Sequence, residues 1–139
     1  MCIRDRINHS EHRISAKEIT NLVKRLKKLK MKTVVCVKNV QEAEKYAKLN
    51  PTYIAIEPPE LIGTGRAIST ERPTLITKSL LAVKKSRNST KLLCGAGIVT
   101  SEDVKRAMEL GSSGILVASG IIKSRNWNRD IEGFAKAIL

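Results

Sequence analysis

Aromatic residues, long apolar runs and paired cysteines are scarce or absent in this sequence, and each scarcity counts against a class of function. Phenylalanine, tryptophan and tyrosine make up only 3% of the 139 residues, which counts against binding of single-stranded nucleic acid by base stacking. No apolar run approaches the roughly 20 residues of a membrane-spanning helix, and no signal-peptide core follows Met1. We therefore expect a soluble, cytoplasmic protein with no membrane contact.

The cysteines are Cys2, Cys36 and Cys94, an odd number at wide spacing. This spacing supports neither a disulfide framework nor a Cys-x-x-Cys metal site. Reduced thiols in a cytosolic protein are the simplest interpretation.

Acidic residues are half as numerous as basic ones, with 13 Asp and Glu against 26 Lys and Arg, which gives a formal net charge of +13. Such an excess of basic residues is typical of proteins that bind nucleic acid, a membrane surface or phosphorylated substrates. A basic nucleic-acid-binding domain is therefore an alternative function, and its main support is the basic stretch from Lys24 to Lys32. The scarce aromatics and the lack of a known binding module count against it. Salt-dependent binding to DNA would discriminate.

Strand-like apolar runs alternate with amphipathic stretches along the whole chain. Ser15 followed by Glu18 is a capping-box pattern and predicts the start of the first helix. The alternation predicts an α/β protein with a parallel sheet and no domain boundary, although pattern alone does not separate a half barrel from a small doubly wound sheet. The predicted strands begin near residues 33, 53, 91 and 114, the last being Ile115–Val117, and the later helices cover Val40–Leu49, Pro73–Arg87, Ser101–Leu110 and Trp127–Ile138.

The segment from Tyr53 to Gly65 combines a buried strand with a loop of uneven stiffness. The apolar run Tyr53–Ile56 ends at a single carboxylate, Glu57, which two prolines follow at once. The prolines stiffen the exit from the strand, whereas Gly63-Thr64-Gly65 supplies backbone freedom farther on. A loop with a rigid root and a soft far end is suited to act as a lid over a site.

Two glycine-rich segments resemble motifs that bind a dinucleotide cofactor or RNA, but each departs from its motif. The run from Gly95 through Gly97 is close to a dinucleotide fingerprint, but Thr100 stands at its third glycine and no acid ends the next strand near residue 117. The Gly111–Gly114 segment has the spacing of an RNA-clamping loop, yet it holds no basic residue. Neither motif predicts a bound cofactor.

Two segments resemble the triosephosphate isomerase family. Glu57-Pro58 followed by Ile62–Gly65 is similar to its catalytic strand and flexible loop. The segment Ile7–Arg13 is similar to its Gly-His-Ser-Glu-Arg-Arg segment, with Asn8 in the place of the glycine and His12 in the place of an arginine. The resemblance covers about Ile7 to Leu139, and the short helices are similar to those of archaeal members.

The resemblance implies a (β/α)8 TIM barrel that is incomplete in this chain. A whole barrel needs at least about 200 residues, so the 139 residues correspond to about five of eight units, from the fourth strand to the eighth helix. An open half barrel leaves strand edges and part of a core uncovered, so a non-catalytic half barrel is a second alternative. Met1–Arg6 carries three charges where the family has an apolar strand, and we interpret residues 1–6 as a non-native prefix.

The resemblance also implies roles for individual residues. Glu57 would be the base that moves a proton, and His9 would be a neutral donor to the substrate carbonyl. Glu11 corresponds to a buried supporting glutamate, whose lysine partner in the family's first strand has no match in this chain. The phosphate of the substrate would be held by backbone N–H groups of Gly63, Gly97, Ala118 and Ser119, where Gly97 replaces a usual serine and Ala118 and Ser119 replace two usual glycines.

The implied reaction interconverts dihydroxyacetone phosphate and D-glyceraldehyde 3-phosphate through an enediolate, in glycolysis and gluconeogenesis. The resemblance implies no cofactor, no metal and no nucleic-acid partner, and a homo-oligomer, dimer or tetramer, when the protein is full length. Because the anchoring lysine has no match here, we expect the isolated chain to have little or no turnover.

Overall fold

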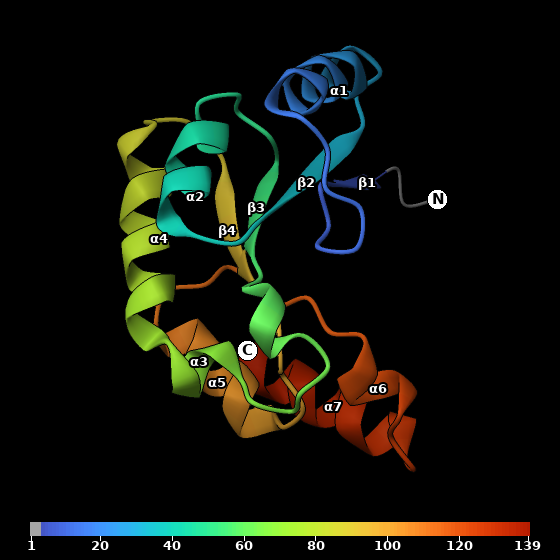
Figure 1. The fold of residues 1–139 in the computed structure, drawn as a ribbon. Coiled ribbons are helices and arrows are strands. Elements are labelled where there is room, and N and C mark those ends of the chain that lie inside the picture. The colour runs from blue at the N-terminus through green and yellow to red at the C-terminus, as the bar shows by residue number, and fades with distance from the viewer. Residues whose placement is uncertain (1–3) are drawn as a thin grey trace.

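The computed structural model describes residues 4–139 and is built on one parallel sheet (Figure 1). The strand order in space, β1-β2-β3-β4, equals the order in sequence. Each strand therefore lies beside the strand that follows it in sequence and runs parallel to it, as in the βα units of a barrel. The strands are β1 (Arg4–Ile7), β2 (Lys32–Val37), β3 (Tyr53–Ile56) and β4 (Lys91–Cys94).

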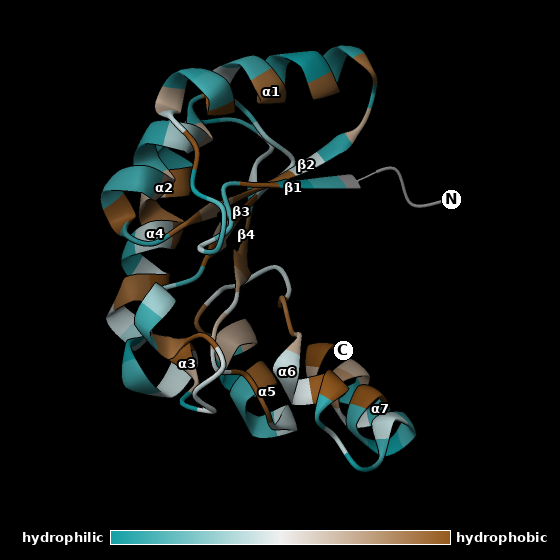
Figure 2. Ribbon diagram, turned by 45° about the vertical axis from the view of Figure 1, so that its right-hand side comes forward, coloured by the Kyte–Doolittle hydropathy of each residue, from teal (hydrophilic) through white to brown (hydrophobic). Residues whose placement is uncertain are grey.

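The helices are α1 (Ala16–Lys28), α2 (Val40–Ala47), the short 3₁₀ helix η1 (Pro59–Leu61), α3 (Ile68–Glu71), α4 (Pro73–Lys85), α5 (Ser101–Glu109), α6 (Ser119–Ile122) and α7 (Trp127–Ile138). The helices α1, α2 and α4 connect the strands and pack against the sheet, whereas α5, α6 and α7 follow β4 and lie beyond the carboxyl ends of the strands (Figure 1). Figure 2 shows β3 and β4 as largely apolar and β1 as largely hydrophilic, while the helices mix apolar and hydrophilic residues. No helix among residues 4–139 is long and apolar enough to cross a membrane.

In β2, β3 and β4 both faces of the sheet are buried, as the continuous apolar strand runs predict. The pairing of Val35 with Ile54 and of Ile54 with Leu92 sets these side chains in one row under the helices. The residues between them point to the opposite face, where Cys36 and Ala55 belong to a much smaller apolar cluster. The large core on the helix side therefore holds the chain together.

The predicted strand at Ile115–Val117 is wrong, because only an isolated bridge between Cys94 and Ile115 forms. The Cys94 N–H donates to the Gly114 carbonyl (3.0 Å), and the Leu116 N–H donates to the Cys94 carbonyl (2.9 Å). Just beyond Cys94 the partner chain leaves the extended conformation, since Ala96 has φ +77°. Without an extended neighbour, the ladder cannot continue to Val117.

Strand β1 was not among the predicted strands, because its charges argued against a buried barrel strand. It pairs with β2 in parallel register through Ile7 opposite Val35, and Ile7 is buried. Asp5 and Arg6 are exposed, which an edge strand tolerates because only one side of it is paired. The interpretation of residues 1–6 as a non-native prefix stays a prediction, and residues 1–3 lie outside the described part of the chain.

The first helix begins at the predicted capping box. The Glu18 N–H donates to Ser15 Oγ (3.2 Å), and the Ser15 N–H donates to Glu18 Oε2 (2.9 Å). These bonds satisfy two backbone donors that a helix start otherwise leaves unpaired. The predicted last helix is confirmed at both ends, whereas α2 and α4 each end two residues earlier than predicted.

We expect Ser15→Ala to lower the free energy of unfolding by about 1 kcal/mol, because the alanine removes the acceptor at the N-cap. Urea denaturation followed by circular dichroism measures the change. Ser89→Ala is the matched control, since Ser89 is exposed and lies outside any helix. Equal midpoints for the two variants would show that the capping box contributes nothing.

Candidate active site

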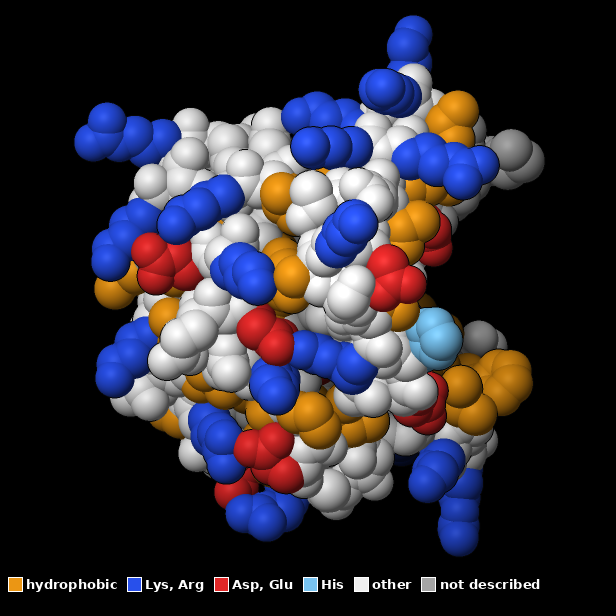
Figure 3. Space-filling model, turned by 45° about the horizontal axis from the view of Figure 1, so that its top comes forward, with side chains coloured by type: hydrophobic (Ala, Val, Ile, Leu, Met, Phe, Trp, Pro, Cys, Tyr) orange, Lys and Arg blue, Asp and Glu red, His pale blue; other side chains and the backbone are white. Residues whose placement is uncertain are grey.

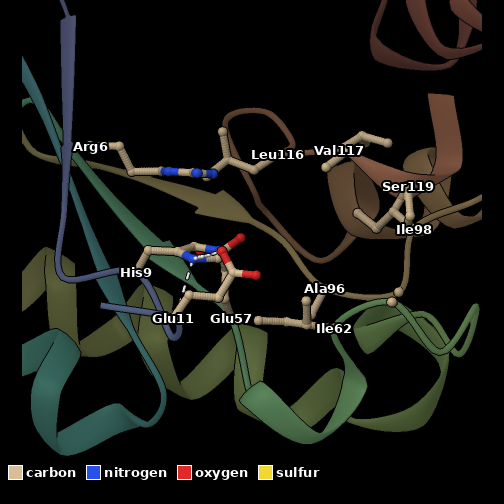
Figure 4. A pocket seen from close by; sticks show the side chains of 13 residues that line it. Arg6, His9, Glu11, Glu57, Ile62, Ala96, Ile98, Leu116, Val117 and Ser119 are labelled. Atoms are coloured by element: carbon tan, nitrogen blue, oxygen red, sulfur yellow. Dashed lines mark hydrogen bonds and ion pairs between the residues drawn. The ribbon is translucent and has the colours of Figure 1, made fainter. Parts of the chain in front are cut away.

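A pocket of about 230 Å³ lies at the carboxyl ends of the strands. Its walls come from the loops after β1, β3 and β4 and from the segment leading into α6 (Figure 4). In a parallel sheet all of these loops emerge at the same edge, so residues far apart in sequence meet there. Every residue that the sequence predicted for the site lines this one pocket: His9, Glu11, Glu57, Gly63, Gly97, Ala118 and Ser119.

Glu57 follows β3 directly and is the buried acid of the pocket. Its backbone N–H donates to the Val37 carbonyl (2.8 Å), which extends the parallel ladder by one residue. The side chain is only 7% exposed, and its Oε2 atom has no hydrogen-bond partner among the described residues. An unpartnered buried carboxylate oxygen is costly unless it serves a purpose, and here it is available to take a proton.

Gly95 makes room for this carboxylate, a role that our sequence analysis missed. A Cβ at Gly95 would lie 2.5 Å from Glu57 Oε1 and 2.6 Å from Glu57 Cγ. The Gly95 N–H donates to the Ile56 carbonyl (3.1 Å), so the two chains continue side by side past the end of the sheet. The pairing of Ile56 with Cys94 is the signal that would have placed Gly95 beside Glu57, but that register cannot be read from the sequence.

Asn8 shapes the loop that presents His9. It is buried and has a left-handed backbone with φ +65°, a conformation that glycine and asparagine adopt most easily. Its side-chain amide donates to the Cys36 carbonyl (3.0 Å), while its Oδ1 accepts the Ile14 N–H (3.1 Å). Asn8 can therefore stand where the family has glycine, and it ties the loop to β2.

His9 lies at the pocket wall with its Nδ1 atom turned toward Glu11. The Glu11 N–H donates to Nδ1 (3.4 Å), and Glu11 Oε2 lies 3.5 Å from the same atom. When Nδ1 accepts a backbone hydrogen bond, the neutral ring carries its proton on Nε2. The Glu11 side chain is 86% exposed and lies at the open side of the pocket, and its supporting role stays a prediction.

The loop after Glu57 has the stiffness pattern expected of a lid. Leu61 is buried and anchors η1, and Glu60 forms an ion pair with Arg72 at the start of α4 (2.6 Å). Farther on, Gly63 has φ +74° and nothing within 4 Å of the place where a Cβ would stand. The root of the loop is therefore fixed and its tip is unpacked. Movement of this lid remains a prediction.

The turn after β4 brings a second set of backbone donors to the pocket. Gly97 has φ +73°, and the Arg66 carbonyl occupies the place that a Cβ would need, so this backbone path requires glycine. Ala118 and Ser119 also line the pocket, with Ser119 beside Ile98 (Figure 4) and opening α6. Within residues 4–139, the N–H groups of Gly97, Ala118 and Ser119 donate no backbone hydrogen bond.

Two buried thiols lie near Glu57. Burial, together with the negative charge of Glu57, raises the pKa of the Cys94 thiol to about 12 and moves the pKa of the Cys36 thiol well above its ordinary range. Both groups are therefore protonated at neutral pH and unsuited to act as nucleophiles. Among residues 4–139 no cluster of three or more His, Cys, Asp or Glu side chains is arranged to hold a metal ion.

Arg6 also lines the pocket, and Figure 4 shows its side chain extending across the space above His9 and Glu57. It belongs to residues 1–6, which we interpret as a non-native prefix. We therefore assign it no role in the site.

A sequence model of the triosephosphate isomerase family matches residues 5–134. The chain belongs to the triosephosphate isomerase family. It is 54% identical to the triosephosphate isomerase of Cenarchaeum symbiosum, over 95% of this chain and 59% of that protein. The enzyme of Methanocaldococcus jannaschii is 43% identical over 95% of this chain and 60% of its own length. The chain thus spans about three fifths of the curated relatives it matches.

Solved structures with similar backbones support the fold class alone. A thiamine phosphate pyrophosphorylase from Pyrococcus furiosus matches 97% of this chain and 57% of its own with a TM-score of 0.66 and 14% identity. A chain of the Amycolatopsis orientalis BexX/CysO complex matches 89% of this chain and 48% of its own with a TM-score of 0.69 and 16% identity. The predicted fold class, parallel βα units of an incomplete TIM barrel, is confirmed by the sheet and the family.

We expect the thiols of Cys36 and Cys94 to resist modification while the protein is folded, because the reactive thiolate is suppressed and access is blocked. In a Cys2→Ser protein, a thiol reagent at about pH 8 should label neither cysteine before unfolding and both in denaturant. Rapid labelling of the folded protein would contradict the burial of these side chains. Peptide mass spectrometry identifies which thiol has reacted.

Proposed function

We propose that the protein containing this chain interconverts dihydroxyacetone phosphate and D-glyceraldehyde 3-phosphate, as its family membership indicates. The observation that carries the proposal is the buried Glu57 carboxylate, whose Oε2 has no partner among residues 4–139, in one pocket with His9 and the glycine-rich turns. This arrangement would bring together a base, a donor to the substrate carbonyl and backbone N–H groups. A cytoplasmic role in glycolysis and gluconeogenesis is part of the proposal.

Glu57 would move the proton that the isomerisation requires. The carboxylate takes a proton from the carbon next to the carbonyl and returns it to the neighbouring carbon, so the base is regenerated. The enediolate formed in between carries negative charge on oxygen. His9 would stabilise that charge by donating from Nε2, the nitrogen left free when Nδ1 accepts the Glu11 N–H.

The substrate phosphate would be held by backbone N–H groups of Gly63, Gly97, Ala118 and Ser119. Such donors carry no titrating proton, and several of them together bind an anion well. A firm grip matters because an enediolate phosphate expels phosphate when its bond rotates into line with the reacting carbons. Closure of the lid over the bound substrate would exclude water and keep the intermediate in place.

The activity is proposed for the whole protein rather than for these 139 residues. The family resemblance puts a substrate-anchoring lysine on the family's first strand, which has no match here, so we expect the isolated chain to have little or no turnover. We also propose a homo-oligomer, dimer or tetramer, for the full-length protein. A half barrel without activity is the competing interpretation, and a turnover assay of the complete protein separates the two.

We expect Glu57→Gln in the full-length protein to lower kcat by about 10²- to 10⁴-fold, because the amide cannot accept the substrate proton. A coupled assay of triose-phosphate isomerisation measures the rate. Glu44→Gln is the matched control, since Glu44 is exposed on α2. If Glu57→Gln retained nearly the wild-type kcat, the assignment of the base would be wrong.

We expect Gly95→Ala to lower kcat by about 10²-fold with a smaller change in KM, since the new methyl group displaces the Glu57 carboxylate from its reactive position. Gly133→Ala on α7 is the control, because a Cβ there meets Ser101 Cβ at an ordinary 3.7 Å. A change in KM alone for Gly95→Ala would show that Gly95 acts on binding and not on the position of the base.

A further inference from the structure

The end of the molecule opposite the pocket carries a concentration of cations. In parallel βα units the carboxyl ends of the helices and the amino ends of the strands meet on one side. In Figure 1 this side lies toward the top, above β2, β3 and β4, while the lid and the pocket loops lie below. We call it the basic end, and it consists of Lys27, Lys28, Lys30, Lys32, Lys48, Lys84, Lys85, Arg87 and Lys91.

All of these side chains are exposed, and within the described residues none of them forms an ion pair. Two long stretches that supply them, residues 19–41 and 72–101, contain no Asp or Glu. Glu109 at the end of α5 is already paired with Arg106 (3.1 Å). Figure 3, in which this end is turned toward the viewer, shows Lys and Arg spread over its upper half with few acidic side chains. Glu44 lines a groove together with Lys84 and Lys85 but forms an ion pair with neither of them. Most of the positive charge at the basic end is therefore unpaired within the described chain.

Stability does not account for this arrangement. Cations in the last turn of a helix interact favourably with the helix dipole, which explains residues such as Lys28 and Lys85. The effect fades beyond that turn and does not explain Lys32 and Lys91, which begin strands. Like charges at close range repel one another, so their accumulation opposes folding unless an anion is bound.

The backbone conformation at the basic end is a further indication that stability alone did not select these cations. Lys30 and Arg87 both have left-handed conformations, with φ +55° and +51°. Positions of this kind just after a helix usually hold glycine or asparagine, which adopt that conformation at lower cost. Both positions therefore present a cation where glycine or asparagine would fit the backbone at lower cost, and the cation also interacts with the carbonyl end of the helix.

The partner that fits is a chain of phosphates and not a lipid surface. The apolar side of α1, formed by Ile19, Val23 and Leu26, is buried in the core, so the helix cannot insert it between lipids as amphipathic membrane helices do. Tyr46 is buried, and none of the residues of the basic end is aromatic, which leaves phosphate contacts without base stacking.

We propose that the basic end binds the phosphate backbone of double-stranded nucleic acid without reading its base sequence. The expectation of no nucleic-acid partner came from the family resemblance and the scarce aromatics; the collection of cations at one end emerges only from the fold. Phosphate contacts position a protein on a duplex and need no aromatic residue. The surface lies at the other end of the sheet from the pocket, so this binding is independent of the proposed isomerase activity.

The test compares two full-length variants that each lose four positive charges. The basic-end variant carries Lys30→Gln, Lys32→Gln, Arg87→Gln and Lys91→Gln. The control variant carries Lys17→Gln, Lys38→Gln, Lys105→Gln and Arg125→Gln, at exposed positions outside the basic end. Fluorescence anisotropy with a labelled DNA duplex of mixed sequence measures affinity between about 50 and 200 mM salt, and thermal unfolding checks that both variants fold.

We expect the wild-type protein to bind the duplex with an affinity that falls steeply with salt. The basic-end variant should bind about tenfold or more weakly at low salt, with a salt slope smaller by about three to four, while the control variant stays within about threefold of wild type. Equal losses in both variants would show an effect of net charge alone and overturn the proposal. If the protein did not bind the duplex but bound vesicles of phosphatidylserine and phosphatidylcholine, the proposal would be overturned and the basic end would be a membrane-binding surface.

Discussion

The register of β3 against β4 determines the geometry of the candidate site. Because Ile56 pairs with Cys94, the next residues along the two chains, Glu57 and Gly95, come to lie side by side. The ladder continues on both sides of Glu57, through its own N–H to Val37 and through the Gly95 N–H to Ile56. A slip of one residue would turn the carboxylate toward the helices. The position of the proposed base is thus a consequence of backbone pairing, and the missing side chain of Gly95 leaves the space that it needs.

The two faces of the sheet have different tasks. On the helix side, branched apolar residues such as Ile54 and Leu92 fill a large continuous core. On the other side, Cys36 and Ala55 leave only a small cluster, with Tyr53 and Leu116 partly covering it. Cys36 belongs to this small cluster, where burial and the negative charge of Glu57 raise the pKa of its thiol. The chemistry of the pocket therefore depends on a part of the sheet that contributes little to the main core.

The parallel topology also places the candidate active site and the basic end at opposite ends of the sheet. Loops at the carboxyl ends of the strands carry His9, Glu57 and the glycine turns, whereas the amino ends collect lysines and arginines. The sequence shows parts of each grouping, such as the basic stretch from Lys24 to Lys32, but only the fold brings the parts from different βα units together. The same sheet thus presents two surfaces with different properties, and a substitution on one of them leaves the other intact.

The sequence by itself determined the features that depend on neighbours along the chain. These include the capping box at Ser15, the buried strand that delivers Glu57, the stiff root and free tip of the lid, and the alternation of the longer helices with β2, β3 and β4. Its pattern of residues was also enough to name the family and the candidate site residues, all of which line one pocket.

Only the tertiary structure decided what depends on pairing across the chain. The charged segment Arg4–Ile7 became a strand because its backbone pairs with β2, and Ile115–Val117 did not, because β4 offers no extended partner beyond Cys94. The exposure of Glu11, the contact of Gly95 with Glu57 and the basic end arise in the same way. Hydrogen bonding between strands acts at a distance in sequence, so local composition cannot report which segments will meet.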